Sequence, residues 1–460
     1  MEQAAAQTIC RATVAPVWGS HSSTPLPMRS NFPLRILCAL LLAAGIVCAD
    51  EYDTLRQKWS DTITGGSAYN TADPTTAAAI TGVTSAANGY WTTMDKSVSR
   101  TFLWSDAAST TVSADLSTNF SRLRAMARAY ATTGSTLQGN ATLLADIIGG
   151  LDWMYANRYN ETKAIYDNWF DFEIGSPLAL VDATTLLYSQ LTAAQIANYM
   201  NAVNKFTPSA TTPAAGGTTG TFTGANRMWK IDVVAVRGII VKDSAKLTAA
   251  RDAFSNLFVY VTGGDGFYTD GSFIQHTKHP YNGSYGAGLL GTMAPVLSLL
   301  SGSTWAVTDP NQSNLIQWVY DSYEPLIYRG GMMAMVSGRD VSRYSSSEHG
   351  TGQGVMQSIL RISQFAPAAD AARMRAMVKY WAQTDSSRNF VGTAPLSLIP
   401  VVEQLMADAS VTPRGELTGN FIFADMDRVV HLRPGFGLGL SMYSLPSWPN
   451  PSNSATPKAC

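Results

Sequence analysis

Residues 120–130 read FSRLRAMARAY, and this short run indicates the class of fold. Its apolar side chains recur at steps of three and four residues, at Phe120, Leu123, Met126, Ala127 and Tyr130. That spacing places them on one face of an α-helix that packs against a core. Similar helices are expected over residues 50–59, 75–91, 143–155, 193–203, 245–261 and 371–381. Glycine- and proline-rich connectors separate these runs, so residues 50 to about 383 are predicted to fold as successive helical hairpins.

The pattern changes after Pro400. Residues 420–424 and 428–432 are short β-branched or aromatic runs, and residues 435–444 alternate glycine with bulky side chains. Such runs are typical of strands. The fold class is therefore predicted to be mainly α, followed by the start of an antiparallel β-sheet. We expect a helical domain over residues 50–395 and the beginning of a β domain over residues 396–460.

Composition excludes several classes of protein. The 460 residues are 46% hydrophobic and 14% charged, which is compatible with a sizeable core and incompatible with wholesale disorder. The formal net charge is −1, and no run of lysine and arginine appears. A nucleic-acid partner is therefore not expected. No metal-ligand spacing is present either, so neither a metal nor another cofactor is expected.

The N-terminal region resembles a secretory signal. An apolar run at residues 36–47 follows Arg29 and Arg35 and precedes Cys48 and Ala49. Twelve residues are too few to span a bilayer, whereas cationic, apolar and small residues in this order are typical of a signal peptide. We expect a signal region at residues 1–49, with residues 28–49 as the working signal. The alternative is a buried core helix.

Removal of that signal leaves Cys460 as the one cysteine, so no internal disulfide is expected. The mature chain is expected to be secreted, extracellular, monomeric and free of the membrane.

Polar and aromatic residues gather in four connectors, at residues 167–177, 221–229, 270–286 and 337–343. Binding sites are often built on such loops. In the third connector, His276 and Tyr285 flank a Pro-Tyr-Asn-Gly turn that could bring an imidazole and a phenol together. Both groups can transfer protons. His279 could compete for the role, and the pair could instead be structural.

The four connectors, in this order, resemble polysaccharide lyase family 8, which contains the hyaluronate, chondroitin AC and xanthan lyases. The matching motifs are Asn168-Trp169-Phe170 with Glu173-Ile174-Gly175, Thr223-Gly224-Ala225-Asn226-Arg227, residues 270–276, Tyr281 with Gly283 and Tyr285-Gly286, Ser337-Gly338-Arg339 with Ser342-Arg343, and Met426-Asp427-Arg428 with His431. The resemblance covers most of residues 50–444. It implies an incomplete (α/α) toroid, and an acidic polysaccharide as substrate.

The resemblance also implies a reaction, the β-elimination of a uronic acid without water. Asn226 matches the residue that neutralises the substrate carboxylate as negative charge builds on it. Tyr285 matches the tyrosine that protonates the leaving oxygen and, in many accounts, first takes the alpha proton. His276 matches a histidine assigned as base or as carboxylate partner. Arg339 matches the arginine beside the tyrosine, where its charge lowers the pKa of a phenol.

Four further residues are expected to bind the polysaccharide. Trp169 and Phe170 match an aromatic patch that stacks on sugar rings, and Asn168 could hydrogen-bond the chain. Arg343 could hold a second carboxylate or a sulfate through a bidentate contact. The alternatives are core packing for the aromatic pair and a salt bridge for the two arginines. Trp229, Trp91 and Trp153 are expected in the core.

The sequence departs from the family pattern at its C-terminal end. The family continues into a stretch that supplies a catalytic-site glutamate and then into further β-sheets, whereas here no glutamate follows Glu416. We therefore expect a truncated chain that is weakly active or inactive when made alone. Two rival functions remain open. One is a non-catalytic carbohydrate-binding remnant, and the other is a glycoside hydrolase, which needs two opposed carboxylates from Asp171, Glu173 and Asp270.

Overall fold

A computed structural model describes residues 49–343 and 346–444 of the chain. Its helices begin and end where local sequence dictates. Helix α2 (Glu51–Thr64) starts at Asp50, whose side chain accepts a hydrogen bond from the Asp53 backbone N–H, and ends at Gly65 in the left-handed conformation. The remaining long helices are α3 (Pro74–Thr93), α4 (Ala114–Ala131), α5 (Ala141–Asn157), α6 (Ser176–Leu186), α7 (Ala193–Phe206), α8 (Gly224–Ile240), α9 (Ser244–Asp252), α11 (Ala287–Leu300), α13 (Glu348–Ile362), α14 (Ala368–Thr384) and α15 (Ile399–Ala407). The mainly α class is confirmed.

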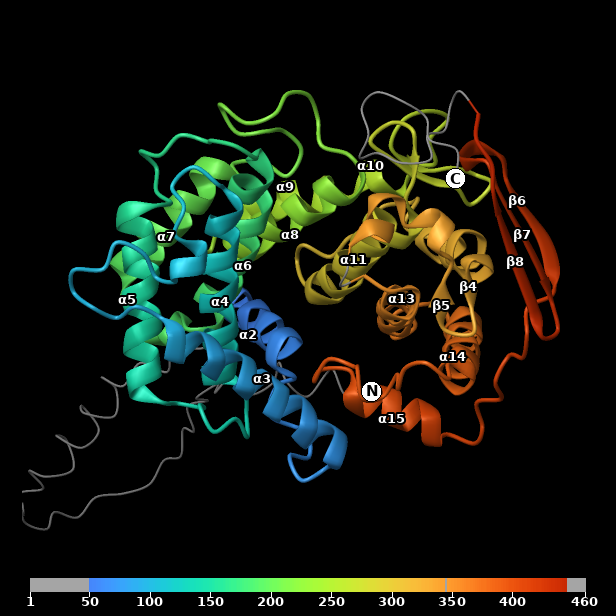
Figure 1. Cartoon of the computed structure of the whole chain (residues 1–460), viewed down its shortest axis with the longest axis horizontal. Coiled ribbons are helices and arrows are strands. Elements are labelled where there is room, and N and C mark those ends of the chain that lie inside the picture. Colours follow the sequence, from blue (N-terminus) through green and yellow to red (C-terminus); the bar gives the residue numbers. More distant parts are fainter. Residues whose placement is uncertain (1–48, 344–345, 445–460) are drawn as a thin grey trace, which may run out of the picture. The chain divides into compact units, whose positions relative to one another are not determined.

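The helices form two layers (Figure 1). In the inner layer, α4, α6, α8, α11 and α13 follow one another as packed neighbours, and α2 contacts the first four of them. Outer helices cover this layer: α3 and α5 pack on α4, α7 on α6, α9 on α8 and α14 on α13. This is the helical-hairpin arrangement of an incomplete (α/α) toroid, as expected.

One predicted helix is broken. Residues 245–261 were expected to be continuous, but α9 ends at Asp252 and a short helix, α10 (Ser255–Phe258), follows. The buried Arg227 Nε donates a hydrogen bond to the Ala253 carbonyl oxygen at 2.9 Å. Phe254 then stacks on Phe258. The tertiary contact with Arg227 outweighs the helical spacing of the local sequence.

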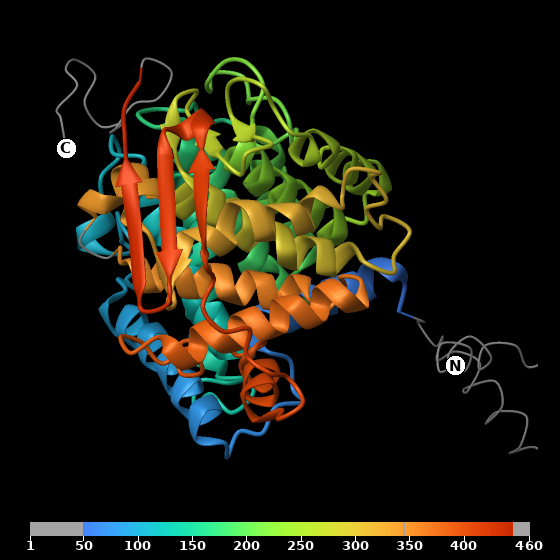
Figure 2. The same cartoon turned by 90° about the vertical axis from the view of Figure 1, so that its right-hand side faces the viewer.

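The three strands predicted near the C-terminal end are confirmed. β6 (Gly419–Phe423), β7 (Arg428–Arg433) and β8 (Phe436–Ser441) form an antiparallel sheet in that order, and Figure 2 shows them side by side in front of the helices. A Cβ on Gly437 would lie 2.9 Å from the Tyr328 ring, and one on Gly439 would lie 2.9 Å from the Met335 sulfur. The alternating glycines therefore let β8 approach the helical part closely.

The limits of the domains stay a prediction. Helix α15 follows the expected boundary at residue 395, and the sheet starts at Gly419. The predicted signal region lies outside the described residues except for Ala49, and so do Cys10, Cys38, Cys48 and Cys460.

Among the described residues, one helical run is long and apolar enough to cross a bilayer. It spans Asn282–Leu300 and includes α11, and 56% of its best apolar window is buried inside the protein. α11 packs between α8 and α13, so its apolar surface is covered by other helices.

Candidate active site

The residues proposed from the sequence come together in one cavity of about 520 Å³. Its lining contains Asn168, Trp169, Phe170, Asn226, His276, Tyr285, Arg339 and Arg343. Three further residues line it, namely Trp229, Ser284 and Asp340. Segments separated by up to 175 positions in the chain thus meet at one place.

Asn226 lies in the first turn of α8 and is 9% exposed. The turn is fixed by Gln275 of β2 (Phe273–Gln275), whose Oε1 accepts a hydrogen bond from the Ala225 backbone N–H at 3.1 Å. Within the described chain, the structure gives the Asn226 amide no hydrogen-bond partner. Its donors are therefore available to a ligand in the cavity.

Gly224 makes this close approach possible, and we expect Gly224→Ala to destabilise the protein. Gly224 has φ +50°, and an added Cβ would lie 2.0 Å from Gln275 Oε1. Strain of this kind costs about 1–3 kcal/mol, on top of the lost Gln275 contact. Thermal unfolding measures the effect. Gly220→Ala is the matched control, because Gly220 also has positive φ but nothing within 4 Å. Equal losses in the two variants would contradict this interpretation.

His276 sits at the tip of a hairpin formed by β2 and β3 (His279–Pro280). His276 and Thr277 both have positive φ, 54° and 69°. Asp265 holds this turn: its carboxylate accepts hydrogen bonds from the Thr277 backbone N–H and the Gln275 side chain, each at 2.6 Å. The His276 and Tyr285 ring centroids lie 4.8 Å apart, so the hairpin brings the imidazole and the phenol together.

Tyr285 lies in a π-helical turn, η4 (Asn282–Gly286), which leads into α11. Such turns are rare in proteins overall, but they often occur at functional sites. The buried Asn282 side chain holds the turn by bonding to the backbone of Gly271 and Phe273. Arg339 donates a hydrogen bond to the Tyr285 hydroxyl oxygen at 2.9 Å. The phenol is therefore fixed at one end by its turn and at the other by a guanidinium group.

The surroundings shift the pKa values of both Tyr285 and His276. Burial raises the pKa of the Tyr285 phenol, and the opposing effect of Arg339 and Arg343 does not offset it. Arg339 lowers the pKa of this phenol, as expected, but desolvation is the larger effect and the net shift is upward. Desolvation by the protein atoms around the His276 ring lowers the pKa of the imidazole, whereas the charge of Asp265 acts to raise it. The side chain nevertheless remains exposed to solvent. Near neutral pH, Tyr285 is a proton donor and His276 a neutral imidazole.

The two arginines come from a short 3₁₀ segment, η8 (Gly338–Ser342), and the residue after it. Gly338 has φ +52°, and a Cβ there would lie 2.0 Å from the Tyr281 ring. Arg343 Nε pairs with Asp340 Oδ1 at 2.9 Å, and Arg343 remains 57% exposed. In the described chain Arg339 forms no such ion pair. The salt-bridge alternative thus holds for Arg343 alone, on the rim of the cavity.

Aromatic rings form a continuous wall of the cavity. Phe170 lies between Trp169 and Trp229, at centroid distances of 6.2 and 5.9 Å, and Trp229 lies 5.8 Å from Tyr285. All four rings are half-buried. The expectation that Trp229 belongs to the core was thus incomplete, because the ring packs on the core with one side and lines the cavity with the other.

The three acidic residues that a hydrolase would need are elsewhere. Asp171 accepts hydrogen bonds from Ser113 and Ser117, and the fully buried Glu173 pairs with Lys230 at 2.5 Å. Asp270 accepts from the backbone of Ser272 and Asp425. None of the three is among the residues that line the cavity, where Asp340 is the one carboxylate. The arrangement does not provide two opposed carboxylates across a sugar.

No group of three or more histidine, cysteine, aspartate and glutamate side chains gathers for a metal ion within the described ranges. The donors of the cavity are instead an amide, an imidazole, a phenol and guanidinium groups beside aromatic faces. That set can stack on sugar rings, hold a carboxylate and move protons. Fold and cavity together define a helical-toroid protein with a site suited to acidic carbohydrates.

Comparison with known proteins narrows this class. The family model for the N-terminal α-helical domain of polysaccharide lyase family 8 matches residues 59–380. A xanthan lyase from Bacillus sp. (strain GL1) is 45% identical over 400 residues, and a hyaluronate lyase from Thermasporomyces composti is 35% identical over 399 residues. The chain belongs to polysaccharide lyase family 8.

Solved structures agree. A Paenibacillus xanthan lyase superposes with a TM-score of 0.83 at 47% identity, and covers 88% of this chain. A Streptomyces coelicolor A3 chondroitin AC lyase, solved with chondroitin sulphate, superposes with a TM-score of 0.80 at 35% identity over 87% of the chain. The matched region is 86% of this chain but 42% of the xanthan lyase and 50% of the hyaluronate lyase. The chain thus spans about half the length of these relatives, or less.

Proposed function

We propose that this protein is a lyase that cleaves uronic-acid-containing polysaccharides by β-elimination. The observation that carries the proposal is the single cavity lined by the eight residues Asn168, Trp169, Phe170, Asn226, His276, Tyr285, Arg339 and Arg343. Family membership and relatives that are xanthan and hyaluronate lyases support the same chemistry.

The difficult step in this reaction is the loss of the proton alpha to a carboxylate. Negative charge builds on the carboxylate as the proton leaves, and an amide donor that is already in place stabilises that charge. We assign this role to Asn226, whose amide has no partner in the described chain. The aromatic wall of Trp169, Phe170 and Trp229 would hold the sugar rings, and Arg343 a second acidic group.

Protonation of the leaving oxygen is assigned to Tyr285. Its raised pKa keeps the phenol protonated near neutral pH, and Arg339 orients the hydroxyl. The other hydroxyl that lines the cavity, that of Ser284, donates to Asp340 instead. Removal of the alpha proton is assigned to His276, because a neutral imidazole can accept it and a protonated phenol cannot.

The pH dependence of catalysis tests the assignment of His276. A base works only when deprotonated, and the pKa of His276 is lowered from 6.5. We therefore expect kcat/KM to fall on the acid side below pH 6.5, and to stay level from there to neutral pH. His276→Gln keeps a hydrogen-bond donor but no base, and should lower kcat by about 100-fold or more. A loss below about tenfold would assign proton removal to Tyr285.

An ultraviolet assay separates the proposal from its rivals. The protein is incubated with xanthan, hyaluronan and chondroitin while absorbance from a new conjugated double bond and new reducing ends are both followed. A lyase raises both, a hydrolase raises reducing ends alone, and a carbohydrate-binding protein raises neither. A high enzyme concentration keeps weak turnover measurable. The absence of both signals would favour the binding remnant.

The remaining proposals concern the setting of the protein. We propose an acidic polysaccharide as its partner, an extracellular location after removal of the signal, and a monomeric state without membrane attachment. The division into a helical domain over residues 50–395 and a β domain from residue 396 is proposed likewise. Secretion of the chain and its mass in solution test these points.

A further inference from the structure

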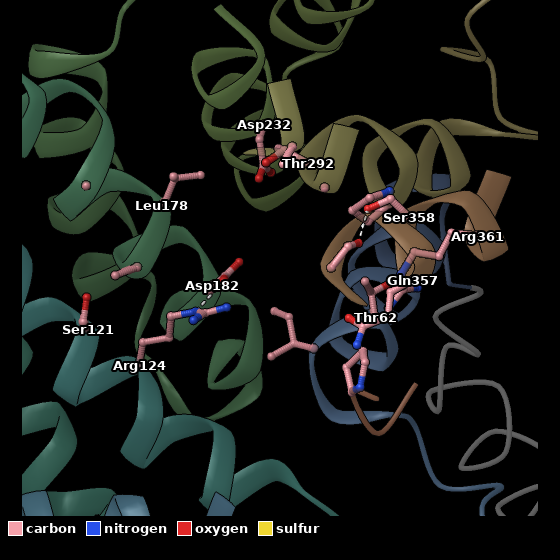
Figure 3. A pocket seen from close by; sticks show the side chains of 18 of the residues that line it. Thr62, Ser121, Arg124, Leu178, Asp182, Asp232, Thr292, Gln357, Ser358 and Arg361 are labelled. Atoms are coloured by element: carbon pink, nitrogen blue, oxygen red, sulfur yellow. Dashed lines mark hydrogen bonds and ion pairs between the residues drawn. The ribbon is translucent and has the colours of Figure 1, made fainter. Parts of the chain in front are cut away.

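A second cavity, of about 770 Å³, lies among the inner helices (Figure 3). We call it the inner cavity. Its lining comes from α2, α4, α6, α8, α11 and α13, and includes Ser284 and Asp340, which also line the candidate active site. The two cavities therefore adjoin at these two residues. The charged side chains of the inner helices have no part in the mechanism proposed above.

Three arginines line the inner cavity, and within the described chain one of them is paired with a carboxylate. Arg124 of α4 is neutralised, since its Nε contacts Asp182 Oδ2 at 2.5 Å. Arg128 and Arg361 also line the cavity, and neither forms an ion pair within the described chain. Arg361 donates a hydrogen bond to the Ser397 hydroxyl at 2.7 Å, and the Arg128 Nε has no partner. A guanidinium group withdrawn from water without a counter-ion favours the binding of an anion.

The environment of Asp232, in α8, indicates that the ligand also carries hydroxyl groups. The side chain is 7% exposed, it lines the inner cavity, and its Oδ1 has no hydrogen-bond partner. Burial raises the pKa of this carboxyl well above its usual value, which favours the protonated form, a donor as well as an acceptor. In Figure 3, Asp232 and Thr292 lie on one side of the cavity, Thr62, Gln357 and Arg361 on another, and Ser121 and Arg124 on a third.

We propose that the inner cavity binds a small sugar acid, a mono- or disaccharide with one carboxylate, at a site separate from the one that cleaves polymer. Arg361 holds the carboxylate, and Asp232 with the surrounding hydroxyl and amide side chains holds the sugar hydroxyls. The volume lies in the range of pockets for small organic ligands and exceeds what a single inorganic ion needs. The proposal rests on the proposed function in one respect, the expectation that uronates are the acids the protein meets.

Calorimetric titration with glucuronate tests this site in the full chain. The titration is made in Arg343→Gln, because the loss of this cation weakens glucuronate binding in the candidate active site, and a further substitution at Arg361 then reports on the inner cavity. We expect one glucuronate to bind there, and Arg361→Gln added to this background to weaken binding by about tenfold or more. Asp232→Leu, which keeps a similar size but has no hydrogen-bonding atom, should also weaken it. Glucose and inorganic sulfate at the same concentrations should bind more weakly than glucuronate.

Several outcomes would overturn the proposal. They are no binding in the Arg343→Gln background, binding by Arg361→Gln or Asp232→Leu that is as tight as without these substitutions, or binding of sulfate as tight as that of glucuronate. If Arg361→Gln fails to fold, Gln357→Glu places a negative charge at the same wall and should weaken glucuronate binding in its place. Because the titration needs no turnover, its result is independent of whether the protein proves to be a lyase.

Discussion

Tyr285→Phe is expected to lower kcat by about 10³- to 10⁴-fold, because it removes one proton-transfer group from a reaction that depends on it. Within the described chain, the hydroxyl accepts one hydrogen bond, from Arg339, and the ring packs against Trp229, Tyr281 and His276. Phenylalanine keeps all of these ring contacts. Steady-state kinetics on uronate polymers would measure the loss, with little change expected in KM.

Tyr281→Phe is the matched control for this variant. Tyr281 lies 4.9 Å from Tyr285 between ring centroids, but it is fully buried and does not line the cavity. Its hydroxyl accepts a long contact of 3.5 Å from the Arg339 backbone N–H, and burial raises its pKa to about 12. We expect a decrease within about tenfold, since no proton transfer is removed. If Tyr285→Phe keeps as much activity as Tyr281→Phe, then Tyr285 is not a proton-transfer group.

Asn226→Ala is expected to lower kcat by about 10²- to 10³-fold, the usual cost of losing a donor aimed at developing negative charge. The amide has no partner in the described chain, so its removal leaves no orphaned group and the melting temperature should barely change. KM should rise less than kcat falls, because the charge on the carboxylate is greatest in the transition state.

Asn226→Asp is the control that changes the charge of the side chain without changing its size. The side chain keeps its shape, but its carboxylate repels the substrate carboxylate, and we expect activity at or below that of Asn226→Ala. Asn157, an exposed residue at the end of α5 outside the cavity, can be changed to alanine as a mock variant. An Asn226→Asp protein with near-normal kcat would contradict the role assigned to this amide.

Helices that meet water on one face could be predicted from the sequence. The inner helix α4 and the outer helix α7 each carry the apolar stripe that such a helix requires. The inner helix α8 has no exposed face, because nearly every residue from Gly224 to Ile240 is buried. The sequence of residues 221–229 therefore indicates a loop, although most of them form the start of α8. α6 and α11 are missed for the same reason.

The candidate site also contains some residues that the sequence indicates and others that it does not. The residues to which we assign the chemistry could be proposed from the sequence, since they stand in motifs that resemble one family. Asp340 and Ser284 could not, because their importance lies in a contact between residues 56 positions apart. The π-helical turns Asp171–Gly175 and Asn282–Gly286 leave no mark in the sequence, yet each one follows or contains site residues. The hairpin at His276 was expected, whereas its anchor, Asp265, was not.

The most direct test of elimination is the mass of the fragments released from a defined hyaluronan or chondroitin oligosaccharide. Elimination breaks the bond without water, so the fragment with the new non-reducing end should be lighter by one water molecule than its hydrolysis counterpart. We expect this lighter fragment from the wild-type protein and its loss in Tyr285→Phe. Fragments of the full hydrolysis mass, or the lighter fragment at an unchanged rate in Tyr285→Phe, would contradict it.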